Sequence, residues 1–197
     1  LSQPNLQDPD SWNSIRNLGN VSDLVVNDGT VSAATALGVF TYDPITDQFS
    51  LDYNEEVVVG LGRVNGLTLA ATSDGNFMRR LGVQIWRRMG APVINDVRAV
   101  STIDDGSVWL ATGTGLRVLG AEAPAPAGEP GSSRFYDLRI VDGDLWAASV
   151  PDDQQRSLSA GVYQLHEGSW TVFDKSTGMP NDELVAIETD REDRVWI

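Results

Sequence analysis

Short apolar runs separated by glycine-containing turns recur along the chain. Residues 28–35, 65–72, 105–112 and 142–149 each begin with an Asp-Gly or Asn-Gly pair and continue into an apolar run that ends in small residues. A second glycine and another short apolar run follow each of them. Asp-Gly and Asn-Gly between apolar runs favour a two-residue hairpin turn, because both central residues of that turn require positive φ. The pattern therefore predicts repeated β-hairpins.

The repeats are regularly spaced. Their anchor residues Val31, Leu67, Val108, Leu145 and Val195 lie 36, 41, 37 and 50 residues apart. The last gap contains an extra segment, residues 151–160, and removing it leaves 40 residues. A period near 40 residues with short strands is typical of a propeller blade.

Each repeat supplies about four strands, and we expect an all-β propeller of four-stranded antiparallel blades with almost no helix. First strands are expected at residues 21–26, 57–61, 97–103, 135–141 and 184–189, and fourth strands at residues 48–51, 83–86 and 169–173. The predicted blades are residues 18–52, 53–90, 91–133, 134–174 and 175–197, the last incomplete, and residues 11–15 are a possible closing strand. We expect these four to five blades to be part of a larger propeller, whose remainder is missing or lies on another chain.

Two units resemble a known family. Residues 103–116 read Ile-Asp-Asp-Gly-Ser-Val-Trp-Leu-Ala-Thr-Gly-Thr-Gly-Leu, and residues 173–182 with 195–197 follow the same scheme. This resembles the two-component regulator propeller repeat, in which an acidic-Gly turn precedes an apolar residue, Trp, an aliphatic and a small residue, Thr and later Gly-Leu. The first two units carry Ser32 and Thr68 where Trp is expected, and the fourth lacks the Thr.

The resemblance implies an extracytoplasmic function. Bacterial propellers of this family form periplasmic sensor regions of hybrid histidine kinases and occur in surface proteins, including a type IX secretion propeller whose layout is similar. We therefore expect a non-catalytic module, periplasmic or at the cell surface, that binds a small-molecule or glycan ligand. The alternative is a scaffold with a protein partner in an envelope or type IX secretion assembly, and the third possibility is an enzyme of the propeller lyase type.

Composition excludes several other classes. With 28 acidic and 14 basic residues the net charge is −14, which repels phosphate backbones, so no nucleic acid partner is expected. Cysteine is absent, and a single histidine, His166, leaves no multi-histidine metal site. No apolar run is long enough to span a membrane. We expect no cofactor and no metal.

The tryptophans and the acidic turns each allow two interpretations. Trp109, Trp146 and Trp196 share one repeat position, and Trp12, Trp86 and Trp170 share another. Repetition at a fixed position favours packing between blades over a ligand-stacking platform. The acidic turns comprise Asp104 with Asp105, Asp142 with Asp144, and Asp190 with Glu192 and Asp193. They suit calcium chemically, but hairpins select Asp for backbone reasons, which favours a structural role.

His166 is the only candidate for general acid–base catalysis. It lies in the turn His166-Glu167-Gly168, between the expected third and fourth strands of the fourth unit. No Gly-x-Ser-x-Gly motif supplies a nucleophile beside it, and a catalytic histidine requires a nucleophile and an orienting carboxylate. We therefore expect no catalytic residue.

The long irregular segments point to a binding face. In a propeller, the loops between blades and those joining second to third strands share one face, here called the loop face. The segments 120–133, 151–160 and 176–182 all map to it. Long loops on a rigid scaffold commonly carry binding residues. The candidate ligand-binding residues there are Arg134, Asp152, Asp153, Gln154, Arg156, Asn181 and Asp182.

Overall fold

Five antiparallel sheets follow one another in the part of the chain that the structure describes. The computed structural model describes residues 18–27, 29–103, 105–120, 134–150, 160–181, 183–190, 192 and 194–197. The first sheet contains β1 (Val21–Asn27), β2 (Thr30–Thr35), β3 (Gly38–Asp43) and β4 (Gln48–Tyr53), in that order. The second contains β5 (Val58–Val64), β6 (Leu67–Thr72), β7 (Phe77–Gly82) and β8 (Ile85–Arg88).

The remaining sheets have fewer or shorter strands. The third sheet contains β9 (Val97–Thr102), β10 (Val108–Thr112) and β11 (Gly115–Val118). The fourth contains β12 (Arg134–Val141), β13 (Asp144–Val150), β14 (Val162–His166) and β15 (Ser169–Phe173), and the last pairs β16 (Glu188–Thr189) with β17 (Val195–Trp196).

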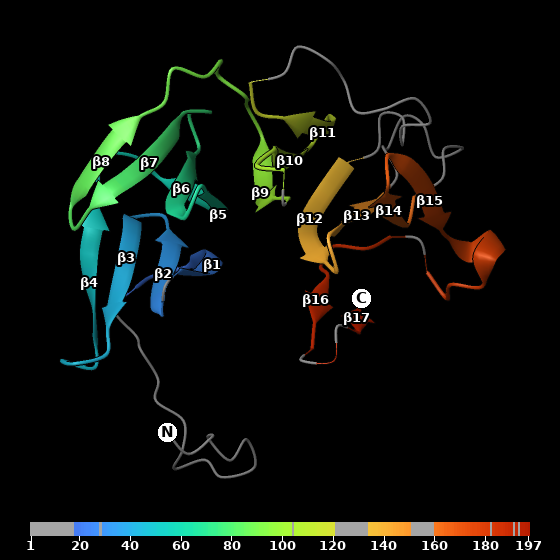
Figure 1. The fold of residues 1–197 in the computed structure, drawn as a ribbon, viewed down its shortest axis with the longest axis horizontal. Coiled ribbons are helices and arrows are strands. Elements are labelled where there is room, and N and C mark those ends of the chain that lie inside the picture. The colour runs from blue at the N-terminus through green and yellow to red at the C-terminus, as the bar shows by residue number, and fades with distance from the viewer. Residues whose placement is uncertain are drawn as a thin grey trace, which may run out of the picture.

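The sheets stand around an open arc, and the first strand of each lies innermost (Figure 1). This is a β-propeller arrangement, as the repeat predicted. The helical content of the described residues is one 3-10 turn, Lys175–Thr177. None of their helices could cross a membrane. The arc is open on the side between the first and last sheets.

The strand register defines the repeat and corrects one anchor. Val31, Val108 and Leu145 pair with the innermost strands at equivalent points, and all lie on second strands. In the second sheet the equivalent residue is Thr68, which pairs with Arg63, and not Leu67. Leu67 instead pairs with Val64 directly after the turn. Leu69, not Thr68, therefore occupies the tryptophan position of that sheet.

The expected fourth strand at residues 83–86 is also shifted. Gly82 pairs with Ile85, so Val83 and Gln84 form the turn between β7 and β8. Gln84 has a φ of 55°, and its backbone N–H donates to Asp52 of the first sheet at 2.7 Å. This contact with a neighbouring sheet holds the turn, and it could not be read from a local apolar pattern.

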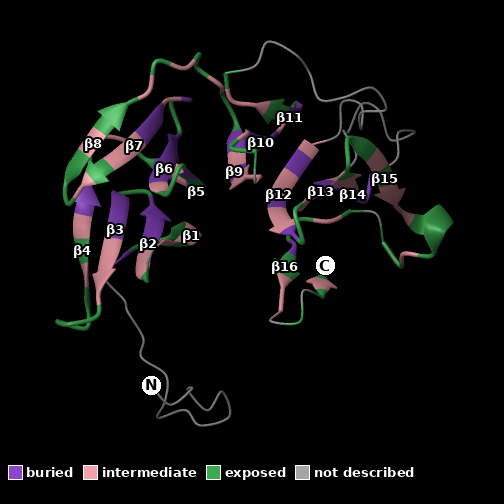
Figure 2. Ribbon diagram, in the orientation of Figure 1, coloured by how far each residue is buried: buried purple, intermediate pink, exposed green. Residues whose placement is uncertain are grey.

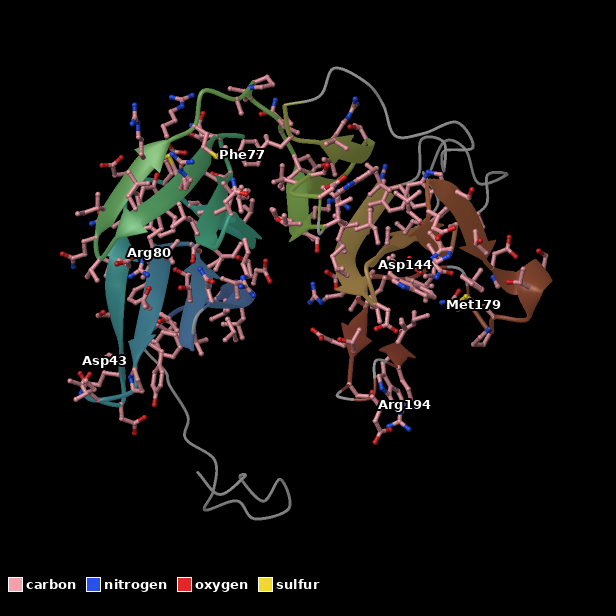
Figure 3. The ribbon with its side chains drawn as sticks, viewed as in Figure 1. Asp43, Phe77, Arg80, Asp144, Met179 and Arg194 are labelled. Carbon is pink, nitrogen blue, oxygen red and sulfur yellow. The ribbon has the colours of Figure 1, made fainter. Side chains whose placement is uncertain are left out.

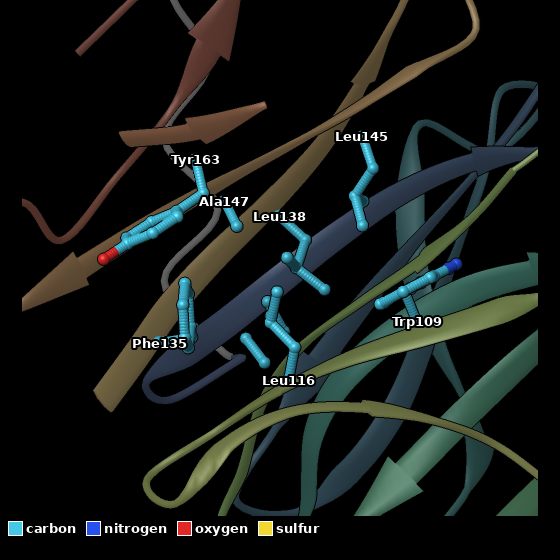
Figure 4. Packing of buried hydrophobic residues seen from close by; sticks show 9 residues of the cluster. Trp109, Leu116, Phe135, Leu138, Leu145, Ala147 and Tyr163 are labelled. Carbon is cyan, nitrogen blue, oxygen red and sulfur yellow. The ribbon is translucent and has the colours of Figure 1, made fainter. Parts of the chain in front are cut away.

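One repeat position on the innermost strands packs each sheet onto the one before it. Leu61, Val100 and Leu138 occupy this position, Ile187 takes the equivalent place directly before β16, and each is at most 6% exposed. Figure 4 shows Leu138 packed with Trp109 and Leu116 of the third sheet. Burial of this kind supplies most of the stability of a repeat protein, since each sheet covers its neighbour.

The same position is uncovered in the first sheet. Leu24 is equivalent to Leu138 by register, yet it is 59% exposed. Val26 on the same strand is also 59% exposed. Figure 2 shows purple buried residues concentrated in β2, β3, β6 and β7, whereas β1 is largely exposed or intermediate. The outward face of the first sheet is thus a free apolar surface on the open side of the arc.

Buried hydroxyls close the loops between second and third strands. Thr35 Oγ1 donates to the Gly38 carbonyl at 3.0 Å, and Thr112 Oγ1 donates to that of Gly115 at 2.7 Å. Ser149 Oγ makes the corresponding bond to Gly161 at 3.1 Å. The hydroxyl at this repeat position therefore has a structural role, and serine replaces threonine in the fourth unit without loss of the bond.

Candidate functional site

The innermost strands enclose an open cavity of about 340 Å³, here called the channel cavity. Strands β1, β5, β9, β12 and β16 all contribute to its wall. Its lining residues are Asp23, Leu24, Val25, Val26, Leu61, Gly62, Arg63, Val100, Ser101, Thr102, Leu138, Arg139, Ile140 and Glu188. Backbone repetition brings together residues that lie far apart in sequence, so one site receives a contribution from each of the five sheets.

Two aspartates at one repeat position connect neighbouring innermost strands. Asp23 Oδ2 accepts from the Leu61 N–H at 2.8 Å, and Asp137 Oδ2 accepts from the Ile187 N–H at 2.9 Å. The other carboxylate oxygen of each accepts from the next residue of its own strand at 2.8 Å. Burial raises the pKa of both carboxyls above the usual 3.8, although these backbone hydrogen bonds oppose the shift.

The corresponding positions of the second and third sheets lack a carboxylate. They are Gly60 and Ala99. A Cβ placed on Gly62 would lie 2.6 Å from Val100 Cγ1. Glycine on β5 therefore permits direct packing of β5 on β9, while the first and fourth sheets use an aspartate.

Arg139 is the central cation of the channel cavity. Its guanidinium donates to Asp137 Oδ1 at 2.8 Å and to Glu188 Oε1 at 2.9 Å. Partial burial opposes its charge, but the hydrogen bond that Arg139 donates to Glu188 and the charges of Asp137, Glu188 and Asp23 raise the pKa of Arg139 above its ordinary value. Arg139 is thus permanently charged, and acidic groups surround it.

The wall combines this charged cluster with hydroxyls and apolar surface. Ser101 and Thr102 add hydroxyl groups from β9, and Thr102 Oγ1 is buried without a hydrogen-bond partner among the described residues. An unpaired buried hydroxyl is destabilising unless a ligand or water completes it. Hydroxyl and carboxylate groups beside leucine, valine and isoleucine can hydrogen-bond a ligand while covering its apolar faces.

The structure describes only two of the predicted loop-face residues. Arg134 begins β12 and pairs with Val150, and Leu184 donates to Ser149 at the same end of the fourth sheet. Asn181 is exposed and its amide accepts from the Glu183 N–H at 3.3 Å. The other candidates, Asp152, Asp153, Gln154, Arg156 and Asp182, lie outside the described residues.

Sequence reasoning missed a cation–π pair near the start of the innermost strands. The guanidinium of Arg98 lies 4.1 Å from the ring centroid of Tyr136, so β9 and β12 meet through this pair. Arg98 also forms an ion pair with Asp96 at 3.2 Å. Arg98 and Tyr136 stand at the bulge position of their repeats, directly before Ala99 and Asp137. Alignment of the bulges would have been the signal that located them.

The tryptophans pack between sheets in most of the described repeats. Trp109 is 5% exposed, and its ring meets Trp170 edge-on at 6.1 Å. Trp146 is partly buried and stacks on Phe173 at 5.6 Å, and Trp86 packs on Tyr53 at 5.5 Å. Trp196 differs, since it is 59% exposed. Trp12 lies outside the described residues.

The acidic turns and His166 make local hydrogen bonds. Asp190 accepts from Trp196, from Arg194 and from backbone N–H groups, and these bonds, led by that of Trp196, lower its pKa to about 2. Asp144 accepts from Gln164 at 2.6 Å and contacts His166 Nδ1 at 2.7 Å. His166 is exposed on the outer hairpin of the fourth sheet. Among the described residues no group of three acidic or histidine side chains is placed to hold a metal.

Comparison with protein-family profiles and with curated proteins gives no match. Solved structures do match. An extracellular domain of a putative hybrid two-component system, BT3049 from B. thetaiotaomicron, superposes with a TM-score of 0.64 at 20% identity, over 98% of this chain and 27% of that one. PorZ, a surface component of the type IX secretion system of Porphyromonas gingivalis, gives 0.56 at 14%, over 86% and 29%.

A streptogramin B lyase structure also matches, with a TM-score of 0.60 at 14% identity over 88% of this chain and 60% of that one. The chain therefore spans about a quarter to three fifths of these proteins. At such identities the likeness concerns the fold. At that level the neighbours, which include extracellular domains of two-component systems and a type IX surface component, confirm the propeller fold that the repeat motif indicated.

Proposed function

We propose that this propeller is a non-catalytic extracytoplasmic module that binds a ligand in the channel cavity, entered from the loop face. The main observation in support is that five innermost strands converge on one open cavity, which holds a charged cluster and an unpaired hydroxyl. The fold similarity to extracellular domains of two-component proteins and to a type IX surface component supports the extracytoplasmic setting.

The lining favours a neutral polyhydroxylated or a cationic ligand. Asp23, Asp137 and Glu188 supply three carboxylates near the cavity, against the cations Arg63 and Arg139. Both Arg139 Nη atoms already donate to carboxylates, so this residue has little capacity left for an anion. The overall charge of −14 further disfavours anions inside the cavity. Sugar hydroxyls could hydrogen-bond Ser101 and Thr102 and lie on the apolar wall.

Titration with defined probes tests the proposal. Neutral mono- and disaccharides and a quaternary ammonium ion are added to the protein and followed by calorimetry. Thr102→Val keeps the side-chain shape and removes the hydroxyl, and Thr171→Val on the outermost strand β15 is the matched control. Binding that Thr102→Val weakens at least fivefold, and Thr171→Val does not, supports the channel cavity. Absence of any difference between the two variants contradicts it.

A scaffold function is the second candidate, because the first sheet has a free apolar face. Leu24 and Val26 are each 59% exposed, and both line the channel cavity. Such a surface suits a protein partner in an envelope assembly. Sedimentation of the wild type and of Leu24→Asp tests it: association that the substitution abolishes supports this function, and a monomer unaffected by the substitution contradicts it.

The proposal assigns no chemistry to His166. The ring of His166 lies at the end of β14, two strands away from the innermost strand β12, and its partner Asp144 begins β13. If a lyase activity is found, His166→Ala should leave its rate unchanged. Loss of that activity in the His166→Ala variant would replace the binding proposal with an enzymatic one.

A further inference from the structure

A second concave site lies on the outer part of the second sheet. It is a groove of about 370 Å³ lined by Arg79, Arg87, Arg88, Met89 and Gly90, here called the arginine groove. It belongs to β7, β8 and the segment that follows β8. Figure 3 places Phe77 and Arg80 of this sheet on the opposite arm of the arc from Asp144 and Arg194. The arginine groove is therefore separate from the channel cavity. Its strands β7 and β8 are separated by β6 from β5, the strand that lines that cavity.

Basic residues are concentrated here against the overall charge. The chain has a net charge of −14, yet four of its thirteen arginines lie in one ten-residue stretch, at positions 79, 80, 87 and 88. Two of the four have partners: Arg80 donates to Asp52 at 2.8 Å, and Arg88 donates to Asn76 Oδ1. Arg79 and Arg87 have no carboxylate partner in the described part of the chain.

Arg79 and Arg87 are paired directly across two strands. The register of β7 and β8 sets them opposite each other on one face of the sheet. Like charges in this position repel and destabilise the pair of strands. Charge on an edge strand can also prevent pairing with other chains, but that role does not require two cations facing each other along a groove. The arrangement is favourable when an anion lies between the two guanidinium groups.

The environment of Arg79 supplies an independent observation. Its Nε is buried and has no hydrogen-bond partner among the described residues. A guanidinium N–H without a partner is a strong donor left incomplete, and the planar arginine fork matches two oxygens of one oxyanion. An anion in the groove would accept from the guanidinium groups of the two arginines and neutralise the repulsion between them.

We propose that the arginine groove binds a compact oxyanion through Arg79 and Arg87. The shared chemistry is a group with two or more anionic oxygens, as in phosphate, sulfate or a carboxylate. The overall negative charge weakens the approach of anions, so binding is in the millimolar range and decreases with added salt. This site works independently of any ligand in the channel cavity.

Thermal melting in matched buffers provides the first test. Sodium phosphate, sulfate and citrate are each compared with sodium chloride at equal ionic strength. We expect at least one oxyanion to raise the melting temperature of the wild type, and its identity distinguishes tetrahedral from carboxylate ligands. Calorimetric titration with that anion should then show at least tenfold weaker binding in Arg79→Gln and Arg87→Thr.

Arg117→Thr is the matched control, because Arg117 is an exposed strand arginine on β11 outside the groove. It should bind the anion as the wild type does. In chloride alone, Arg87→Thr should melt at a higher temperature than Arg117→Thr, since it removes the like-charge pair. Equal anion binding by all three variants, or no response of the wild type to any oxyanion, would overturn the proposal.

Discussion

Asp137 Oδ2 accepts a hydrogen bond from the backbone N–H of Ile187, 2.9 Å away, and thereby ties the innermost strand of the fourth sheet to that of the last. Asp23 makes the same contact with Leu61 between the first and second sheets. Neighbouring innermost strands belong to different sheets, so no backbone ladder of hydrogen bonds joins them. These two carboxylates therefore hold the arc together where the sheets converge.

Replacing Asp137 with asparagine should destabilise the protein. The carboxylate accepts one backbone N–H on each oxygen, from Leu138 and from Ile187. An asparagine side chain offers only one acceptor, so an N–H donor would face an amide NH2 group. We expect a loss of about 1–3 kcal/mol in the free energy of unfolding, measured with urea.

Asp47→Asn is the control for that substitution. Asp47 lies in an exposed turn at a φ of 52°, a conformation that asparagine adopts readily. Its replacement should change the free energy of unfolding by less than about 0.5 kcal/mol. Equal effects of the two substitutions would show that the contact between Asp137 and Ile187 contributes nothing.

Stability should increase as the pH falls from 7 toward 4. Burial raises the pKa of Asp23 and Asp137 above 3.8, so the native state holds their protons more tightly than the unfolded chain does. Their contribution is complete below pH 3.8 and is lost as the pH rises through the raised pKa. His166 acts in the same direction, because its bond to Asp144 raises its pKa above 6.5.

Groups with lowered pKa values do not oppose this trend within the window. The pKa of Asp190 is about 2, so its contribution is lost only as the pH falls toward that value. Melting temperatures measured from pH 4 to 7 should show the slope, and Asp137→Asn should reduce it. A slope of the opposite sign in the wild type would contradict the burial of these two carboxyls.

Trp109 should act as a packing residue and not as a ligand platform. Its ring is 5% exposed and contacts Trp170, whereas Trp196 at the same repeat position is 59% exposed. Trp109→Ala should lower the free energy of unfolding by about 3–5 kcal/mol, and Trp196→Ala by less than about 1 kcal/mol. A Trp109→Ala protein that is as stable as the wild type but has lost ligand binding would contradict this packing role.

The sequence was sufficient for the fold because the repeat is local. Asp-Gly and Asn-Gly turns and apolar runs recur every 40 residues or so, and hydrogen-bonded hairpins depend on little else. Even so, the anchor in the second unit was displaced by one residue. Leu67 resembles the apolar anchors in composition, but only the pairing of Thr68 with Arg63 reveals which residue is equivalent.

The sites could not be found in this way, because they depend on contacts between repeats. Arg98 and Tyr136 are 38 positions apart in the chain, and Asp23 and Leu61 are separated by the same interval. Hydropathy patterns describe neighbours along one strand and not across two sheets. The arginine groove is a partial exception, since the cluster of arginines at 79–88 is visible in the sequence, although their opposition across β7 and β8 is not.

Truncating Leu24 and Leu138 in turn tests whether anything covers the open side of the arc. They occupy the same repeat position, but Leu138 is 1% exposed against the third sheet and Leu24 is 59% exposed. A buried leucine loses transfer free energy and leaves a cavity when truncated, so Leu138→Ala should lower the free energy of unfolding by about 2–5 kcal/mol. Leu24→Ala should lower it by less than about 1 kcal/mol, because most of that side chain is already in water.

Urea unfolding of both variants at several protein concentrations gives the comparison. A large loss for Leu24→Ala that depends on concentration would mean that a second molecule covers the first sheet, and a large loss independent of concentration would contradict the exposed position of Leu24.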